Sequence, residues 1–137
     1  MTITICGSLS HYKKGVQVKN KLQKQGHTVL WPWGMQERAE GRLLQKDLNK
    51  FKSANQGKAI KVHYEKIKKA DAVLIVNEDK NGIKNYIGGN TLMEMGFAYV
   101  LGKPIYLLNP IPEKISWSEE IVAMKPVVLK ENLKLVR

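Results

Sequence analysis

A glycine-rich turn followed by a carboxylate is the part of this chain whose residue types could do chemistry. An apolar run at Ala72–Val76 is followed by Gly88 and Gly89, and a helical pattern then carries Glu94 among apolar neighbours. In an α/β sheet, ligands bind outside the carboxyl ends of the strands, next to helix N-termini. A carboxylate there can bond covalently to a sugar carbon as the leaving group departs. Glu94 is therefore the candidate catalytic residue.

The same glutamate has a structural alternative. Thr91 and Glu94 match the T-x-x-E capping box, in which the glutamate reaches back to the amide at the helix N-terminus. Two features favour a functional role over capping. The glycine pair before the helix lets a ligand approach the backbone closely, and the small residues Gly96 and Ala98 let the helix lie against the sheet.

A second candidate element follows the first expected strand. Gly7, Ser8 and Ser10 offer amides and hydroxyls that could hold a phosphate or a sugar hydroxyl at the start of the next helix. Lys13, close in sequence, could add positive charge for a 5'-phosphate. The segment lacks a Walker loop and the full G-x-G-x-x-G pattern. The alternative is an ordinary strand-to-helix turn with Ser10 as the N-cap.

Aromatic side chains accompany both elements. Tyr86 precedes the glycine pair and could stack on a base or hydrogen-bond a sugar, and Trp31 and Trp33 could form a base-stacking wall. Packing without a ligand is the equal alternative for each of them. The three histidines and the single cysteine show no metal-ligand spacing, so we expect neither a metal nor a cofactor.

Composition limits the partners and the compartment. A net charge of +11 over 137 residues favours an anionic partner such as a nucleotide. The lysines are scattered as on solvated helix faces and aromatic residues make up only 7%, so a nucleic-acid groove is not expected. The first residues do not resemble a signal peptide, and no apolar run approaches the roughly 20 residues of a membrane-spanning helix. We expect a cytoplasmic protein without membrane contact.

Five short apolar segments alternate with helical patterns. The expected strands are Thr2–Cys6, Thr28–Trp31, Ala72–Val76, Lys103–Leu108 and Val127–Leu129. The expected helices are Gly15–Gln25, Met35–Phe51, Ile60–Lys69, Thr91–Leu101 and Ser116–Met124, with a break at Ser53–Gly57. Such alternation predicts parallel βαβ units with both faces of the sheet covered. Residues 1–137 are therefore expected to form a single α/β domain with a five-stranded parallel sheet.

Several segments, in this order, resemble a known family. They are residues 3–8 (Ile-Thr-Ile-Cys-Gly-Ser), 26–30 followed by Pro32, 67–75, 89–98 and 102–105. With them the chain resembles the nucleoside 2-deoxyribosyltransferase family, whose relatives include 2'-deoxynucleoside 5'-phosphate N-hydrolases. The resemblance implies a flavodoxin-like, Rossmann-like sheet and a nucleoside or nucleotide substrate. It also implies that Glu94 attacks the anomeric carbon and displaces the base, and that a second base or water then takes the sugar.

The resemblance further implies a homo-oligomer built on dimers, in which neighbouring subunits complete each other's pockets. Two positions depart from the family pattern, because transferases usually carry acidic residues where this chain has Gly88 and His63. His63, Tyr86 or Asn90 could replace those acids.

The expected substrate-binding residues are Gly7, Ser8, Ser10, His63, Tyr86, Gly88, Gly89, Asn90 and Thr91. Two functions remain open: an N-glycosidic enzyme, transferase or hydrolase, and a nucleotide-binding sensor without turnover.

Overall fold

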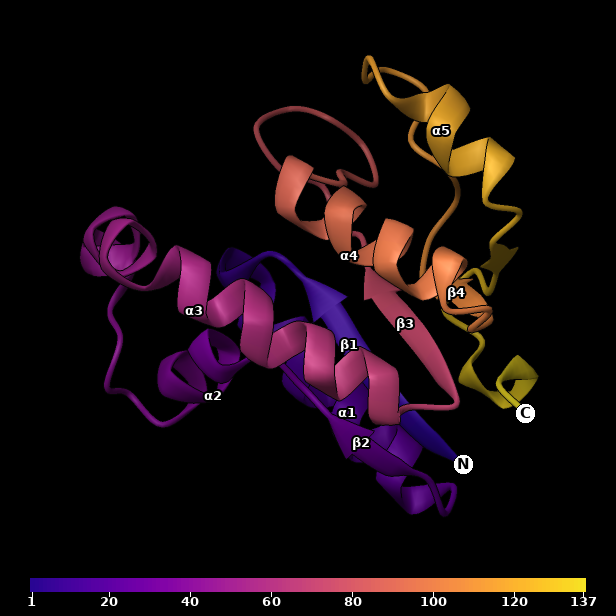
Figure 1. Ribbon diagram of the computed structural model, residues 1–137, viewed down its shortest axis with the longest axis horizontal. Coiled ribbons are helices and arrows are strands. Elements are labelled where there is room, and N and C mark those ends of the chain that lie inside the picture. Colours follow the sequence, from indigo (N-terminus) through magenta and orange to yellow (C-terminus); the bar gives the residue numbers. More distant parts are fainter.

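Five parallel strands form one sheet in the order β2-β1-β3-β4-β5 in the computed structural model, which describes residues 1–137 (Figure 1). The strands are β1 Thr2–Gly7, β2 Thr28–Leu30, β3 Ala72–Val76, β4 Ile105–Leu107 and β5 Val127–Val128. Each begins and ends within two residues of its expected position. The prediction of a five-stranded parallel α/β fold is confirmed.

Helices cover both faces of this sheet (Figure 1). They are α1 Tyr12–Lys24, α2 Trp33–Ala39, α3 Leu48–Lys69, α4 Gly89–Val100 and α5 Ser118–Ala123, with single 3₁₀ turns η1 Leu9–His11, η2 Gln45–Asp47 and η3 Leu133–Leu135. None of the helices has the length and apolar character that crossing a bilayer requires.

The strands divide their side chains between two cores, because successive residues of a strand point to opposite faces. Along β1, Ile3 and Ile5 belong to the core that α1 and α2 cover, with Leu22 and Met35. Cys6 belongs to the other core, beneath α3, α4 and α5. This alternation places the one thiol of the chain on the same face of the sheet as α3 and α4.

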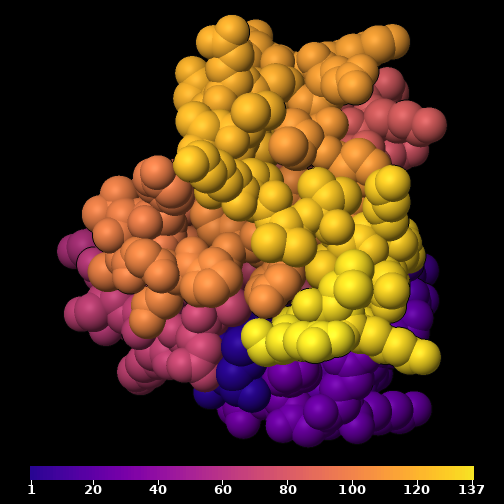
Figure 2. Space-filling view, turned by 90° about the vertical axis from the view of Figure 1, so that its right-hand side faces the viewer, coloured from indigo at the N-terminus to yellow at the C-terminus, as the bar shows by residue number.

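The C-terminal segment closes the first of these cores. Leu133 and Val136 pack there with Leu129, and the hydroxyl of Tyr106 lies 3.5 Å from the carbonyl oxygen of Arg137. Figure 2 shows this face of the molecule, where the last residues lie beside the N-terminal strand. The end of the chain therefore covers this face of the sheet next to β4.

The expected helix from Met35 to Phe51 is wrong, because two helices and a turn occupy that range. Helix α2 ends at Ala39, and Gly41 has a φ of +77°, in the left-handed region that glycine adopts without strain. The single turn η2 then leads into α3 at Leu48. The apolar residues whose spacing suggested one helix are divided between the segment that joins the two helices, which holds Leu43 and Leu44, and the first turns of α3, which hold Leu48 and Phe51.

The expected break at Ser53–Gly57 is also wrong, because α3 runs through it without interruption. The side-chain amide of Asn55 donates to the carbonyl oxygen of Phe51 one turn earlier, at 2.8 Å. Asparagine and glycine disfavour a helix interior by less than about 1 kcal/mol each relative to alanine. Burial of Leu48 near one end and Ile67 near the other outweighs that cost.

Candidate functional site

The chain connections run in opposite directions along the sheet on the two sides of the boundary between β1 and β3. A cavity opens at the carboxyl ends of these two strands. From β1 the chain moves to β2 on one side, then crosses to β3 on the other. The cavity has a volume of about 250 Å³. Its lining comes from the residues after β1, β2 and β3, from one face of α3 and from the first turns of α4. This is the position at which open α/β sheets bind ligands.

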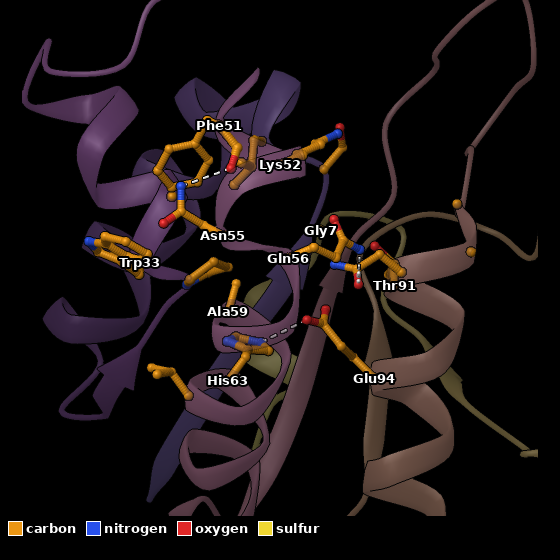
Figure 3. Close-up of a pocket in the computed structure, with 18 of the residues that line it drawn as sticks. Gly7, Trp33, Phe51, Lys52, Asn55, Gln56, Ala59, His63, Thr91 and Glu94 are labelled. Carbon is orange, nitrogen blue, oxygen red and sulfur yellow. Dashed lines mark hydrogen bonds and ion pairs between the residues drawn. The ribbon is translucent and has the colours of Figure 1, made fainter. Parts of the chain in front are cut away.

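Glu94 and His63 form the floor of the cavity, where their side chains point toward one another from α4 and α3 (Figure 3). Glu94 Oε2 lies 3.7 Å from His63 Nε2. The same imidazole nitrogen lies 3.3 Å from Sγ of Cys6, which sits at the end of β1 directly below. We call these three side chains the buried cluster, since none of the three residues is more than 6% exposed as a whole.

Burial sets the protonation of this cluster. It raises the pKa of Glu94 to about 8, although a hydrogen bond from Cys6 lowers it in part. It lowers the pKa of His63 to about 4, with a smaller contribution from the positive charge of Lys66. Burial also raises the pKa of Cys6. At pH 7 the cluster therefore holds a neutral imidazole, a neutral thiol and a Glu94 carboxyl that keeps its proton.

The start of α4 fixes the position of Glu94. Gly88 is the N-cap and no side chain caps the helix, so Thr91 lies inside the first turn. The capping-box alternative for Glu94 is therefore wrong, and its carboxylate is directed to the cavity floor. The preceding turn is anchored by Trp117, whose indole N–H donates to the carbonyl oxygen of Ile87 at 2.8 Å.

Gly88 also makes room for an aromatic ring. A Cβ at this position would lie 3.2 Å from Cε1 of Tyr86. Tyr86 thus packs over the glycine, and both residues line the cavity.

The opposite end of the cavity is positively charged. Ser8 caps η1 by accepting a hydrogen bond from the amide of Ser10 at 3.2 Å, so Ser10 is not the N-cap. Lys80, from the loop after β3, donates to Ser8 Oγ at 3.0 Å. Burial lowers the pKa of Lys80, and the charge of Lys52 lowers it further. Two ammonium groups thus share this end of the cavity, an arrangement that an anion would stabilise.

An aromatic wall closes the side formed by α2 and α3 (Figure 3). The rings of Trp33 and Phe51 lie 5.3 Å apart and tilted by 56°, and both line the cavity. Trp31 does not line it and packs against the sheet core instead. Across the cavity mouth, the amide of Gln56 on α3 donates to Asn90 Oδ1 on α4 at 3.4 Å. Stacking surface and amide groups are thus available for a nucleobase.

The structure brings nearly all the predicted site residues together. Glu94 and every expected substrate-binding residue except Ser10 line the cavity. Lys13 does not line it either, and Lys80 supplies the positive charge beside Ser8.

Apart from His63, sequence reasoning missed the face of α3 that points into the cavity. Its residues recur every three or four positions, at Lys52, Asn55, Gln56, Ala59, Val62 and His63. The expected break at 53–57 concealed this spacing. Lys80 could have been predicted from the sequence. It follows β3 as Ser8 follows β1, and residues that follow parallel strands lie at the same edge of the sheet.

The comparisons with known proteins agree with this geometry. The model of the nucleoside 2-deoxyribosyltransferase family matches residues 5–125. The structure is similar to a 2-deoxyribosyltransferase from Bacillus psychrosaccharolyticus, with 24% identity, a TM-score of 0.54 and coverage of 93% of this chain and 98% of that one. It is also similar to the CMP N-glycosidase BcmB of Clostridium botulinum, with 15% identity, a TM-score of 0.50 and coverage of 93% and 84%. No curated protein matches the chain.

At these identities, the two solved structures show a shared fold. The family model covers most of the chain, including β1, the α3 face with His63, and the α4 segment that carries Glu94. The chain therefore belongs to the nucleoside 2-deoxyribosyltransferase family.

Proposed function

We propose that this protein cleaves the N-glycosidic bond of nucleosides or nucleoside monophosphates, by transfer or hydrolysis, with Glu94 as the nucleophile. One observation carries the proposal. The only carboxylate that lines the cavity is buried on its floor, at the carboxyl ends of the strands and below a pocket with an aromatic wall. A carboxylate held in this way can attack a sugar carbon without competing hydration.

The reaction balances with the groups that are present. Ionised Glu94 attacks the anomeric carbon, the bond from that carbon to the base nitrogen breaks, and its electron pair leaves with the base. A glycosyl ester on Glu94 results. The Glu94 carboxyl releases a proton before attack and the departing base takes up one, so this half-reaction needs no net proton. Water or a second base then attacks the same carbon, the ester bond to Glu94 breaks, and the proton that the attacking group loses restores the protonated carboxyl.

The charged end of the cavity supports a monophosphate as the preferred substrate. Ser8 and Lys80 lie at the opposite end from the buried cluster, with Lys52 near them. A 5'-phosphate placed there would neutralise two ammonium groups that now repel one another. The sugar would then lie over Glu94, and the base would lie toward Trp33.

The test is to incubate the protein with ribo- and deoxyribonucleosides and their 5'-monophosphates and measure the free base by chromatography. Each reaction is run with and without a second base, so that transfer and hydrolysis are separated. Glu94→Gln is the key variant because it keeps the size of the side chain and removes the anion. We expect base release from the wild type and none from Glu94→Gln. Full activity of that variant would exclude Glu94 as the nucleophile.

One observation favours a second candidate, a nucleotide-binding sensor without turnover. The two positions where family transferases usually carry acids hold Gly88, covered by Tyr86, and His63, whose imidazole is neutral at pH 7. Intact-mass spectrometry after incubation with a slowly released substrate analogue separates the two candidates. A glycosyl adduct on Glu94 supports the enzyme, whereas tight nucleotide binding with no adduct and no free base supports the sensor.

A further inference from the structure

Three side chains with metal-binding atoms meet at the cavity floor from three different elements. Cys6 comes from β1, His63 from α3 and Glu94 from α4. Their ligand atoms all lie within 4.8 Å of one another, and all three residues are buried. Side chains on three packed elements have little freedom to separate, so this grouping is a fixed feature of the fold.

The distances match those of a tetrahedral zinc site. With ordinary Zn–S, Zn–N and Zn–O bonds, neighbouring sulfur and nitrogen ligands lie about 3.6 Å apart, and nitrogen and oxygen ligands about 3.3 Å apart. The observed separations are 3.3 Å from Cys6 Sγ to His63 Nε2 and 3.7 Å from that nitrogen to Glu94 Oε2. Adjustments of a few tenths of an ångström would bring these two pairs to tetrahedral separations. The third pair, Cys6 Sγ and a Glu94 carboxylate oxygen, lies within 4.8 Å, and a rotation of the Glu94 side chain would bring it toward the separation of about 3.6 Å in a tetrahedral site.

The charges in the cluster also suit a divalent cation. A thiolate and a carboxylate would neutralise its two positive charges, and a neutral complex is the form that a buried position favours. The one cation nearby is Lys66, which lies close enough to influence His63. Its ammonium group is directed away, toward the carbonyl oxygen of Trp31 at 2.7 Å.

The alternative is that the three groups only hydrogen-bond to each other. That arrangement accounts for both contacts of His63 Nε2. His63 Nδ1 is buried with no hydrogen-bond partner in either arrangement, because zinc would bind Nε2, so the geometry of the three ligand atoms carries the comparison. His63 and Glu94 both line the cavity, so an ion between them would keep an open side toward it. Three protein ligands and one open position are the pattern of an accessible zinc site.

We propose that Cys6, His63 and Glu94 bind Zn²⁺ at the cavity floor, and that the bound ion inhibits the enzyme by ligating Glu94. Binding displaces one proton from the thiol and one from the carboxyl, and His63 Nε2 offers its lone pair. The metal occupies the carboxylate that must attack the sugar, so an enzyme with zinc cannot form the glycosyl ester. The inhibition rests on the proposed function, whereas metal binding does not.

Cobalt(II) is the probe for the site, because it occupies zinc sites and absorbs visible light. Titration of the intact protein should give intense four-coordinate absorption, together with thiolate-to-cobalt charge transfer in the near ultraviolet. Cys6 is the only cysteine, so charge transfer reports this thiol alone. One equivalent of Zn²⁺ should remove both signals, and Mg²⁺ should not.

Cys6→Ser should lose the charge-transfer band and bind Zn²⁺ at least tenfold more weakly by calorimetry, with melting curves to check that it folds. His11→Gln is the matched control, because this histidine lies outside the cluster and should leave both signals intact. Absence of four-coordinate absorption in the wild type, or Zn²⁺ affinity unchanged in Cys6→Ser, would overturn the site.

Activity separates this proposal from the proposed function. Zn²⁺ should stop base release, and a chelator should restore it. If cobalt binds as described but no nucleoside is ever cleaved, the metal site stands and the enzyme proposal fails. If nucleosides are cleaved and Zn²⁺ neither binds nor inhibits, the metal site fails and the enzyme stands.

Discussion

Glu94 and His63 face each other across 3.7 Å at the bottom of the cavity, with side chains 7% and 5% exposed. In water such a pair would exchange a proton to form a salt bridge. Here burial opposes charge on both groups, raising the pKa of the acid to about 8 and lowering that of the base to about 4. The proton therefore stays on the carboxyl at neutral pH, and Glu94 cannot act as the proposed nucleophile until that proton leaves.

Turnover should consequently rise with pH. With a pKa of about 8 for Glu94, about a tenth of the free enzyme is ionised at pH 7 and nearly all of it at pH 9. We expect kcat/KM for a nucleoside to increase about tenfold over that interval. A nucleoside rather than a monophosphate is used, because the phosphate itself titrates near pH 6. A profile that is flat or falls between pH 6 and 9 would contradict an ionised Glu94 as the nucleophile.

Folding stability should fall as the pH rises from about 6.5 to 8. The folded pKa of Glu94 is raised from 4.5 to about 8, so the folded state holds a proton that the unfolded state releases, and stability falls as pH rises between these values. The folded pKa of His63 is lowered from 6.5 to about 4, so stability rises with pH between those values.

The two effects on the free energy of unfolding offset each other between about pH 4.5 and 6.5. From pH 6.5 to 8 only the effect of Glu94 remains, and the free energy of unfolding falls by about 2 kcal/mol. Urea unfolding across this range should show the loss in the wild type and not in Glu94→Gln, which should be the more stable protein at pH 9. Glu65→Gln, an exposed change on α3, is the control and should keep the wild-type profile. The same pH dependence in Glu94→Gln would show that the loss arises elsewhere.

Phosphate preference should depend on Lys80 and Ser8. Calorimetry should show that monophosphates bind the wild type more tightly than the matching nucleosides, with a difference that shrinks at high salt. Lys80→Ala should weaken monophosphate binding about tenfold, the effect of losing a charge-assisted hydrogen bond, and leave nucleoside binding nearly unchanged. Ser8→Ala should also reduce the difference in affinity between monophosphates and nucleosides, but by less than Lys80→Ala does.

Lys84→Ala is the control for that experiment, because this lysine lies in the same loop as Lys80 but does not line the cavity. Equal wild-type affinity for both ligand types, independent of salt, would exclude a phosphate subsite.

The protein should form a homo-oligomer built on symmetric dimers, as the family resemblance implies and as closed symmetric assemblies commonly do. Sedimentation velocity over a range of concentrations measures this directly. We expect the smallest active species to be a dimer. A monomer that keeps full activity at the working concentration would show that each pocket is complete within one chain.

Local sequence was sufficient for the sheet and for many of the residues that line the cavity. Ala72–Val76 is apolar at every position, as a strand covered on both faces must be, and it forms β3 with the expected bounds. Gly88, Gly89 and Glu94 were identified from the same local rule, that ligands bind where strands end and helices begin. Both features depend on neighbours a few residues away, which is why periodicity and turn residues predict them.

Helix boundaries between residues 35 and 57 needed tertiary contacts. Gly41 ends one helix where the apolar spacing continues, and Asn55 and Gly57 lie inside another although their propensities disfavour it. Packing energies decide such cases, because they exceed the small propensity differences between residues. The cavity-facing residues of α3 can be recognised by their spacing only when the helix is known to run through residues 53–57.

The buried cluster is the feature that only the tertiary structure decided. Cys6 and His63 are separated by 57 residues, and no spacing rule connects them. They meet because α3, which connects β2 to β3, packs over the face of β1 that carries the thiol. Helix α4, which follows β3, packs beside α3 on the same face of the sheet and brings Glu94 to the cluster. The protonation of Glu94 has the same origin, since a pKa depends on the water that surrounding side chains exclude. Sequence alone identified the carboxylate, and the packing around it determines when it carries a charge.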